Sequence, residues 1–286
     1  MKKLCYLILG CTLLSSCNTQ KSNKQEEQDQ KVIHDIDKLL EDLPDPSAVA
    51  FTLKRVQAEF ADSLVNSKEN LSNYLGDIDK LSINMGVYAA DVNYLACYGQ
   101  KDLTMDYAKL CHTIGETLGD SAIFTSELLS EIESSLNDEE KLSHLLRTMI
   151  VQTSVTLEKD HHLSMAALAL AGTYIEEMYH AVNIIDNYHD EGLSKDELKL
   201  KIEPLVRLVL DQEKPLIDLI ALLKDIPHDD FILNLLTQLN ILDRLYQGEL
   251  AAIEEKMNAD ETYVLNRDHM YGITLEIERI REEIIK

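Results

Sequence analysis

Two short stretches of the chain place a tyrosine and an acid at the same spacing after a glycine. Gly86–Asp91 and Gly172–Glu177 both follow the pattern Gly-x-Tyr-x-x-acid. A tyrosine hydroxyl and a carboxylate on one helix face can share a buried hydrogen bond or line a ligand pocket between two helices. The candidates for such a polar packing cluster or pocket are Tyr88, Asp91, Tyr174 and Glu177.

Both glycines lie within predicted helices, where glycine costs about 1 kcal/mol relative to alanine. Alanines surround each of them. This composition predicts a close approach of two helices, with Gly86 and Gly172 leaving room for a neighbouring backbone. We expect Gly172→Leu to destabilise the fold by about 1–3 kcal/mol through overpacking, and Gly172→Ala to be neutral or mildly destabilising. The match between the two stretches is compatible with an internal duplication.

Motifs for metals and cofactors are incomplete. Glu177 and His180 form one Glu-x-x-His pair, whereas ferritin-like di-iron bundles use two such pairs and two further glutamates. His161 and His162 could supply half of a zinc site, but no partner pair is visible. Phosphate loops, dinucleotide motifs and nucleophile elbows need glycine clusters that this sequence lacks. We therefore expect no catalytic residue, metal or cofactor, which favours a protein that is not an enzyme.

The N-terminus has the layout of an export signal. Lys2 and Lys3 precede an apolar run from Leu4 to Leu14, and Ser15, Ser16 and Cys17 follow it. The run is shorter than the roughly 20 residues that span a bilayer. The stretch resembles the bacterial lipoprotein signal, and the resemblance implies that Cys17 is acylated and becomes the mature N-terminus. A plain cleaved signal and a weak membrane helix are the alternatives.

The chain resembles a group of all-helical lipoproteins of Bacteroidota type. The resemblance rests on the cysteine motif at Cys17, on residues 84–94 (NMGVYAADVNY) and on residues 170–176 (LAGTYIE). It implies a helical fold and an address in the cell envelope, attached to the outer membrane and facing the periplasm or the cell surface. It implies no activity.

The charge of the chain restricts its partners. The formal net charge is −24, and removal of a signal that carries two lysines and no acid would make the mature chain more acidic still. Nucleic-acid binding needs basic groups that displace counterions, and an anionic lipid surface attracts basic segments. We therefore expect no nucleic acid, attachment to the membrane through the lipid alone, and an unknown envelope protein or small ligand as the further partner.

Cys97 and Cys111 are the cysteines left beyond Cys17. They fall on two consecutive predicted helices and would be offset by roughly 10 Å along the axis, from a rise of 1.5 Å per residue. A disulfide requires Cα atoms closer than about 7 Å. Two reduced, buried thiols are expected, with a disulfide and a reactive thiol as alternatives.

Nearly the whole chain beyond Val32 carries helical spacing of apolar residues, and the complete sequence of 286 residues contains only 10 glycines and 5 prolines. This pattern predicts an all-α fold, an antiparallel helical bundle built from helical hairpins, with a short α-solenoid as the alternative. The expected organisation is a signal peptide at 1–16, a lipidated cysteine and disordered tether at 17–31, a helical bundle at 32–191, and C-terminal helical hairpins packed on it at 192–286.

Several helix boundaries can be predicted more closely. Apolar spacing predicts helices over residues 47–65 and 68–98, and Ser194 with Glu197 predicts a capping box. Pro204 and Pro215 should kink or split the helix that follows. The leading hypothesis is a lipid-anchored binding or scaffold module without catalysis. The alternative is a small-ligand carrier or enzyme with a pocket between the two Gly-x-Tyr helices.

Overall fold

The computed structural model describes residues 16–42, 52–119, 125–138, 163–187, 194–260, 263–265 and 267–286, with a few positions between 141 and 148. Every regular element within these ranges is helical, which confirms the all-α prediction. The longer helices are α1 (Ser16–Asp42), α4 (Ile78–Cys97), α5 (Lys101–Thr117), α6 (Ser126–Ser135), α8 (Leu163–Asp186), α9 (Lys195–Leu210), α10 (Glu213–Asp225), α11 (Asp230–Leu245), α12 (Ala251–Ala259) and α13 (Tyr271–Ile284).

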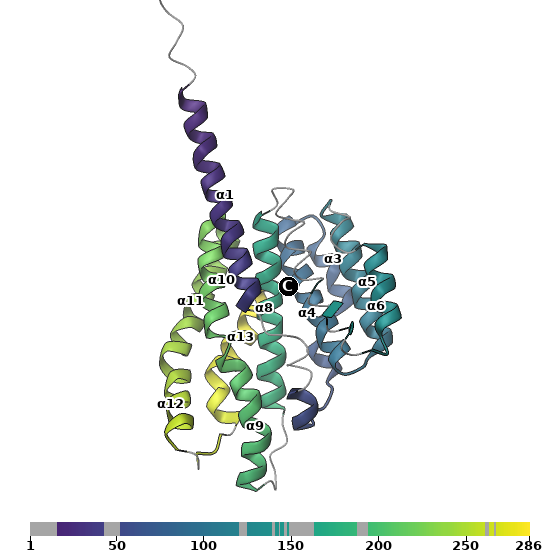
Figure 1. Ribbon diagram of the computed structural model, residues 1–286, viewed down its shortest axis with the longest axis vertical. Helices are drawn as coiled ribbons and strands as arrows, with labels where there is room; N and C mark the ends of the chain where they lie inside the picture. The colour runs from purple at the N-terminus through teal and green to yellow at the C-terminus, as the bar shows by residue number, and fades with distance from the viewer. Residues whose placement is uncertain are drawn as a thin grey trace, which may run out of the picture.

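Helix α8 runs through the middle of the molecule. Helices α4, α5 and α6 lie on one side of it, and α9 to α13 lie on the other (Figure 1). The buried apolar residues of these helices form one continuous cluster on both sides of the boundary predicted near residue 192. The segments 32–191 and 192–286 therefore share one core. In the described part of the chain, no helix has both the length and the hydrophobicity needed to cross a membrane.

Helices α4 and α8 form the closest pair in the core, and they run parallel. Gly172 lies against the backbone of Ile83, and about two turns further along both helices His180 meets Asp91. Short turns make consecutive helices such as α4 and α5 antiparallel. The pair α4 and α8 does not follow this arrangement. The chain passes through α5 and α6 before α8 begins, so the direction of α8 is not set by a short connection to α4.

The two glycines make the contact between α4 and α8 reciprocal. A Cβ atom on Gly172 would lie 1.9 Å from the Ile83 carbonyl oxygen, and a Cβ atom on Gly86 would lie 1.8 Å from the Ala169 carbonyl oxygen. Each carbonyl belongs to the residue three positions before the other glycine. The predicted close approach is confirmed, and it is tighter than we expected, because even an alanine methyl group would overlap a backbone atom.

Helix α1 includes the segment predicted to be a disordered tether. It runs without interruption from Ser16 to Asp42, and its N-terminal part projects from the body of the molecule (Figure 1). The tether has no apolar residue, but its Gln, Lys and Glu residues are good helix formers, and they extend a helix that is already anchored further along. Val32, Ile36 and Leu39 provide that anchor and are buried.

Ionic contacts reinforce the packing of α1 on α10. Lys31 Nζ lies 2.6 Å from a carboxylate oxygen of Asp225, Lys38 pairs with Asp218, and Lys214 pairs with Asp42. The lysines are 47% or more exposed, so each pair is expected to contribute only a fraction of a kcal/mol. The buried apolar face of α1 is the larger source of its attachment.

The helix predicted over residues 68–98 is divided. A short turn of α3 (Leu71–Tyr74) ends before Gly76, whose φ of +100° is left-handed, and Asp77 then caps α4 by accepting a hydrogen bond from the Lys80 N–H. The predicted helix over 47–65 is also wrong for residues 57–65, which are irregular apart from one 3₁₀ turn at Asp62–Leu64. Its first part, 47–51, lies outside the described residues.

Prolines and caps shape the C-terminal helices. The capping box of Ser194 and Glu197 is present. Helix α9 continues through Pro204, and the chain breaks instead at Asp211 and Gln212. Pro215 then occupies the first turn of α10, where its missing N–H group would have no helical partner. Beyond α11 the chain continues as the π-helical turn Tyr246–Leu250 and helix α12.

Cys97 and Cys111 are both free thiols, as expected, but the expectation that both are buried is wrong for Cys97, which is half-buried. Cys111 is buried, and its burial raises the pKa of the thiol well above its usual range. Residues 1–15 of the predicted signal peptide (1–16), the side chain of Cys17, and His161 with His162 lie outside the described residues.

Candidate functional site

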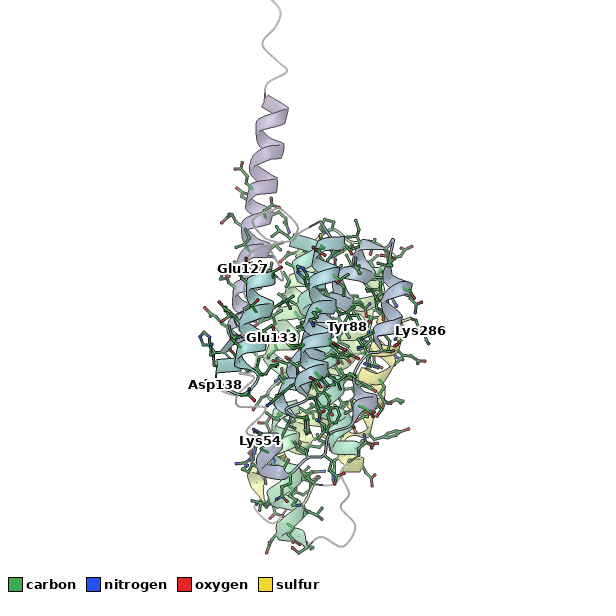
Figure 2. The ribbon with its side chains drawn as sticks, turned by 90° about the vertical axis from the view of Figure 1, so that its right-hand side faces the viewer. Lys54, Tyr88, Glu127, Glu133, Asp138 and Lys286 are labelled. Atoms are coloured by element: carbon green, nitrogen blue, oxygen red, sulfur yellow. The ribbon has the colours of Figure 1, made fainter. Side chains whose placement is uncertain are left out.

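The structure buries three of the four predicted residues and leaves the fourth half-buried. Tyr88 and Tyr174 are fully buried, and Asp91 has no exposed surface, whereas Glu177 is half-buried. Figure 2 shows Tyr88 inside the body, away from exposed residues such as Glu127 and Asp138. Glu177 lines a small cavity between α4, α8 and α9, and Tyr88, Asp91 and Tyr174 are not part of that lining.

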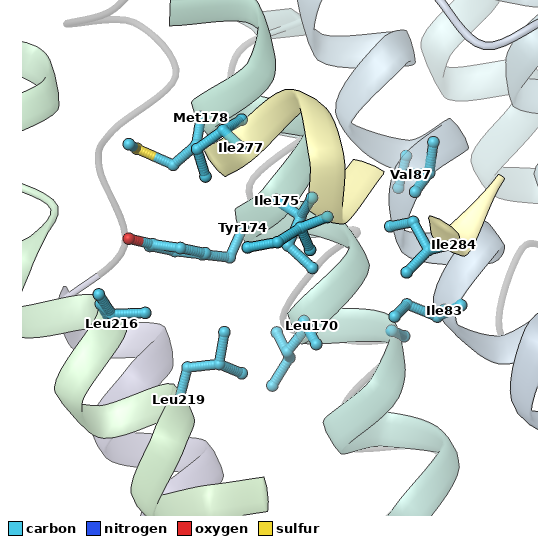
Figure 3. Packing of buried hydrophobic residues seen from close by; sticks show 14 of the residues in the cluster. Ile83, Val87, Leu170, Tyr174, Ile175, Met178, Leu216, Leu219, Ile277 and Ile284 are labelled. Atoms are coloured by element: carbon cyan, nitrogen blue, oxygen red, sulfur yellow. The ribbon is translucent and has the colours of Figure 1, made fainter. Parts of the chain in front are cut away.

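Neither tyrosine pairs with the acid of its own motif. The Tyr88 hydroxyl donates to the Ser67 carbonyl at 2.8 Å. The Tyr174 hydroxyl donates to the Gln212 carbonyl at 3.2 Å. Figure 3 shows Tyr174 on the side of α8 that faces Leu216, with Val87 of α4 on the other side. Both tyrosines thus tie the core to backbone carbonyls of other segments.

Asp91 belongs to a buried network that sequence reasoning largely missed. Its Oδ1 lies 3.2 Å from Nε2 of His180. The same imidazole nitrogen lies 3.7 Å from Glu176, and both Glu176 oxygens accept hydrogen bonds from the Arg281 guanidinium, at 2.7 and 2.8 Å. The Arg281 guanidinium also lies over the Tyr179 ring, 3.9 Å from its centroid. The network therefore connects α4, α8 and α13.

The same side chains satisfy the backbone of the irregular segment 57–67. The Asn66 N–H donates to Asp91 Oδ2 at 3.0 Å. The Leu64 carbonyl accepts hydrogen bonds from His180 and Arg281. Since a buried backbone group without a partner destabilises the fold by an amount comparable to a lost hydrogen bond, these contacts explain how a non-helical segment is held against the core.

Two tyrosines complete the hydrogen bonding of this segment. The Tyr94 hydroxyl accepts a hydrogen bond from the Ala61 N–H and donates to the Ala61 carbonyl, at 3.0 and 3.2 Å. The Tyr107 hydroxyl donates to the Asn66 carbonyl at 2.8 Å. The Tyr94 ring stacks on the His180 imidazole with ring centroids 4.4 Å apart. The network and the tyrosines act together as a polar clasp (Asp91, Glu176, His180 and Arg281, with Tyr94 and Tyr107).

The geometry of the polar clasp requires one proton between Asp91 and His180. His180 donates to the Leu64 carbonyl, and since its Nε2 faces carboxylates, the donor is Nδ1. In the neutral imidazole Nε2 is then an acceptor facing another acceptor, Asp91 Oδ1. Burial raises the pKa of Asp91 well above its usual range and lowers the pKa of His180 to about 4, so the proton resides on Asp91.

With that proton in place the polar clasp is electrically neutral. Burial and the neighbouring Asp91 raise the pKa of Glu176 to about 7, while Arg281 lowers it. Protonation of Asp91 removes its repulsion and leaves Glu176 ionised against Arg281. Buried charges persist when they are paired and hydrogen-bonded, and this arrangement meets both conditions.

Asp91, Glu176 and His180 also approach each other closely enough to bind a metal ion, with one donor atom of each within 4.8 Å of the others. The surrounding contacts fit a proton better than a divalent cation. Both Glu176 oxygens are bound by the positive Arg281, and Asp91 Oδ2 accepts from the Asn66 backbone. The Glu-x-x-His pattern in the sequence pairs Glu177 with His180. In the structure the glutamate that lies near the His180 imidazole is Glu176.

Replacement of the protonated carboxyl by an amide tests this assignment. Asp91→Asn can donate to His180 and accept from Asn66 without carrying an ionisable proton. A group with a raised folded-state pKa contributes stability that is present below the unfolded pKa and lost as pH rises through the folded pKa. The wild type should therefore lose stability as pH rises from 5 to 8, whereas Asp91→Asn should not. We expect the free energy of unfolding of Asp91→Asn, relative to that of the wild type, to increase by about 1 kcal/mol or more between these pH values in urea unfolding curves.

The control for this experiment is Asp268→Asn, at an exposed position. Its unfolding midpoint should follow that of the wild type at both pH values. An Asp91→Asn protein that is less stable than the wild type by the same amount at pH 5 and pH 8 would show that Asp91 is ionised in the fold, and the proton assignment would be wrong.

Glu177 borders a small cavity next to the polar clasp. The cavity has a volume of about 80 Å³ and lies between α4, α8 and α9. Burial raises the pKa of Glu177 to about 7, although a hydrogen bond with Asn93 lowers it. Of the four predicted residues, Glu177 is therefore the one that the structure places at a cavity.

Some signals for the missed residues were present in the sequence. Glu176 and His180 are four positions apart, a spacing that places both on one helix face. Arg281 is a basic residue within the apolar stripe of α13, which includes Ile277 and Ile284. A cation on a buried stripe implies a buried acid as its partner, but only the structure identifies that acid as Glu176.

Comparison with known proteins found no matching family model, no matching curated protein and no matching solved structure. The function of the chain is therefore argued from its own residues.

Proposed function

We propose that the protein is a non-catalytic, lipid-anchored component of the bacterial cell envelope that acts as a binding or scaffold module. Acylation of Cys17 at the end of the export signal would attach it to the outer membrane, facing the periplasm or the cell surface. The observation that carries the proposal is the combination of that cysteine motif with α1, which begins at Ser16. Cys17 would stand about 22 Å along the helix from Val32, at 1.5 Å per residue.

This geometry supports a spacer role for the first part of α1. Residues 18–30 contain acidic, basic and amide side chains but no apolar residue, so they do not seek the bilayer interior. Beyond them, α1 is packed on α10. A helical spacer would keep the acidic body away from lipid headgroups while the acyl chains supply the attachment, for which about two chains are sufficient.

The closed polar clasp supports the non-catalytic part of the proposal. Each carboxylate oxygen of Asp91 and Glu176 has a partner within the fold. A general base or nucleophile must reach a substrate atom within hydrogen-bond distance. These carboxylates instead hold the segment 57–67, so their chemistry serves the architecture.

The lipid anchor is tested by metabolic labelling with a palmitate analogue. We expect the wild-type protein to be labelled and to sediment with the outer membrane, because the diacylated cysteine holds it there. Cys17→Ala should lose the label and leave the membrane fraction. Cys97→Ala is the matched control and should remain labelled. Labelling that persists in Cys17→Ala would refute the anchor.

The cavity at Glu177 favours a second candidate function, a small-ligand carrier. Ligand sites are concave and mostly apolar, with a few convergent polar groups. The cavity meets that description, although its volume of about 80 Å³ restricts it to a small chemical group.

A further inference from the structure

The cavity at Glu177 has an apolar wall with a few polar side chains. The apolar lining comes from α4, α8, α9 and the short helical segment 52–56, and the polar lining consists of four residues. Its lining residues include Leu53, Ala90, Tyr94, Met178, Ala181, Ile184, Leu205 and Leu208 and the polar Asn93, Glu177, His180 and Gln212. An apolar site of this kind favours an apolar ligand group, because the transfer of such a group out of water is favourable. A polar group of the ligand is favoured only where the polar side chains converge.

Two of the four polar residues already have partners within the fold. His180 Nε2 faces Asp91, and the Gln212 amide donates to the Leu208 carbonyl at 3.3 Å. Neither is therefore directed primarily at a ligand. The polar character of the cavity rests on Asn93 and Glu177.

Asn93 and Glu177 present hydrogen-bond acceptors. The Asn93 side chain is 7% exposed, and its Oδ1 has no hydrogen-bond partner among the described residues. Its amide forms a hydrogen bond with the Glu177 carboxylate, so the two side chains contact each other in the lining of the cavity. Buried acceptors without a donor are unfavourable, so a ligand that donates hydrogen bonds would complete the site.

We propose that this cavity binds a primary alkylammonium ion with a short aliphatic chain. The ammonium group donates to the Glu177 carboxylate and Asn93 Oδ1, and the chain lies against Ala181, Ile184 and Leu205. This assignment names the ligand class of the second candidate function and rests on it.

Charge and size both favour this class. A half-buried carboxylate is stabilised by a cation, and an ammonium group carries three donors for the two acceptors. The protein has a net charge of −24, which raises the local concentration of cations. The cavity volume of about 80 Å³ is about half of the roughly 150 Å³ that holds a benzene molecule. A chain of about three or four carbon atoms fits that space.

The test is a titration of the full-length protein in detergent with three probes of equal chain length. The probes are n-butylamine, n-butanol and butyrate, and calorimetry at pH 8 measures their affinities. We expect n-butylamine to bind more tightly than n-butanol, and butyrate not to bind. Glu177→Gln keeps the shape of the side chain and removes its charge, and it should weaken n-butylamine by about tenfold or more, as expected for a charged hydrogen bond.

Two further variants distinguish binding at this cavity from effects of a substitution on the protein as a whole. Glu254→Gln makes the same change at an exposed position on α12, and it should bind n-butylamine as the wild type does. Ala181→Leu fills the cavity without altering Glu177, and it should abolish binding while the circular dichroism spectrum remains helical. If Ala181→Leu does not fold, the comparison of Glu177→Gln with Glu254→Gln decides the question.

The possible contradictions are distinguishable. Equal affinity for n-butanol and n-butylamine, or unchanged n-butylamine affinity in Glu177→Gln, would overturn the ammonium assignment but retain a small-ligand site. Preferential binding of butyrate would do the same. If none of the three probes binds, both the assignment and the carrier function fail, whereas the lipid anchor is decided separately by the labelling of Cys17.

Discussion

Gly172→Ala is expected to destabilise the protein by an amount at or above the upper end of the range of about 1–3 kcal/mol that is typical of overpacking. The new Cβ atom would lie 1.9 Å from the Ile83 carbonyl oxygen and 3.1 Å from the Val87 nitrogen. These are backbone atoms of α4, so the overlap cannot be relieved by a rotamer change. Helices α4 and α8 must separate, and the core contacts along both of them weaken.

The effect of Gly172→Ala opposes the intrinsic preference of the helix for alanine, which is about 1 kcal/mol. Gly248→Ala is the control because nothing lies within 4 Å of the position that its Cβ would occupy. That variant should be stabilised by up to about 1 kcal/mol. Urea unfolding followed by circular dichroism measures both changes. Gly172→Ala unfolding at or above the wild-type midpoint would show that the close contact is not formed in solution.

The reciprocal contact predicts a matching result for Gly86→Ala. Its Cβ would lie 1.8 Å from the Ala169 carbonyl oxygen, so the loss should equal that of Gly172→Ala within about 1 kcal/mol, the lower bound for overpacking. The double variant should lose less than the sum of the two single losses, because both substitutions separate the same pair of helices.

The sequence indicated this contact only in part. A glycine in the middle of an apolar helix predicts that a neighbouring backbone lies close, and Gly86 and Gly172 do face each other's helices. The pattern does not indicate whether the neighbouring helix runs parallel or antiparallel, or how far apart the axes of the two helices lie. For that reason the expected penalty for Gly172→Ala was too small, and the parallel arrangement of α4 and α8 was not predicted.

The acid in the second motif shows a different limit. Glu176 and Glu177 differ by about 100° around the helix, since an α-helix has 3.6 residues per turn. In α8 that rotation separates the carboxylate of the polar clasp from the carboxylate of the cavity. The phase of a helix against its neighbours depends on the whole core, and Arg281, the partner of Glu176, lies 105 residues further along the chain. Sequence spacing alone could not choose between the two glutamates.

The expected tether at residues 18–30 illustrates a third limit. Composition correctly identifies these residues as unable to contribute to an apolar core, and none of Glu26, Glu27 and Gln28 is buried. Composition alone does not account for the helix that these residues form as part of α1. Once Val32 and Ile36 are packed on α10, each added residue extends an existing helix and avoids the unfavourable nucleation step.

Arg281→Met is expected to produce the second large loss, about 3–5 kcal/mol, because it leaves Glu176 buried without its cation. Methionine retains the aliphatic volume beside Tyr179 but provides no donor for the Glu176 oxygens or the Leu64 carbonyl. The segment 57–67 would then lose a contact that holds it against α8. Arg279→Met is the matched control on the same helix, since Arg279 forms partly exposed pairs with Glu276 and Glu283, and pairs open to solvent are worth about 0–1 kcal/mol.

The charge of Glu176 can be separated from the packing of Arg281 by a double-mutant cycle. Glu176→Gln in the Arg281→Met background removes the unpaired charge and should restore part of the lost stability.

Lower pH should act in the same direction. Without Arg281 the folded-state pKa of Glu176 rises further above its unfolded value, so the stability of Arg281→Met falls as pH rises from 5 to 8. In the wild type this contribution is smaller, because Arg281 lowers the pKa of the Glu176 carboxylate. Equal losses for Arg281→Met and Arg279→Met, with no dependence on pH, would mean that the polar clasp does not hold the fold together.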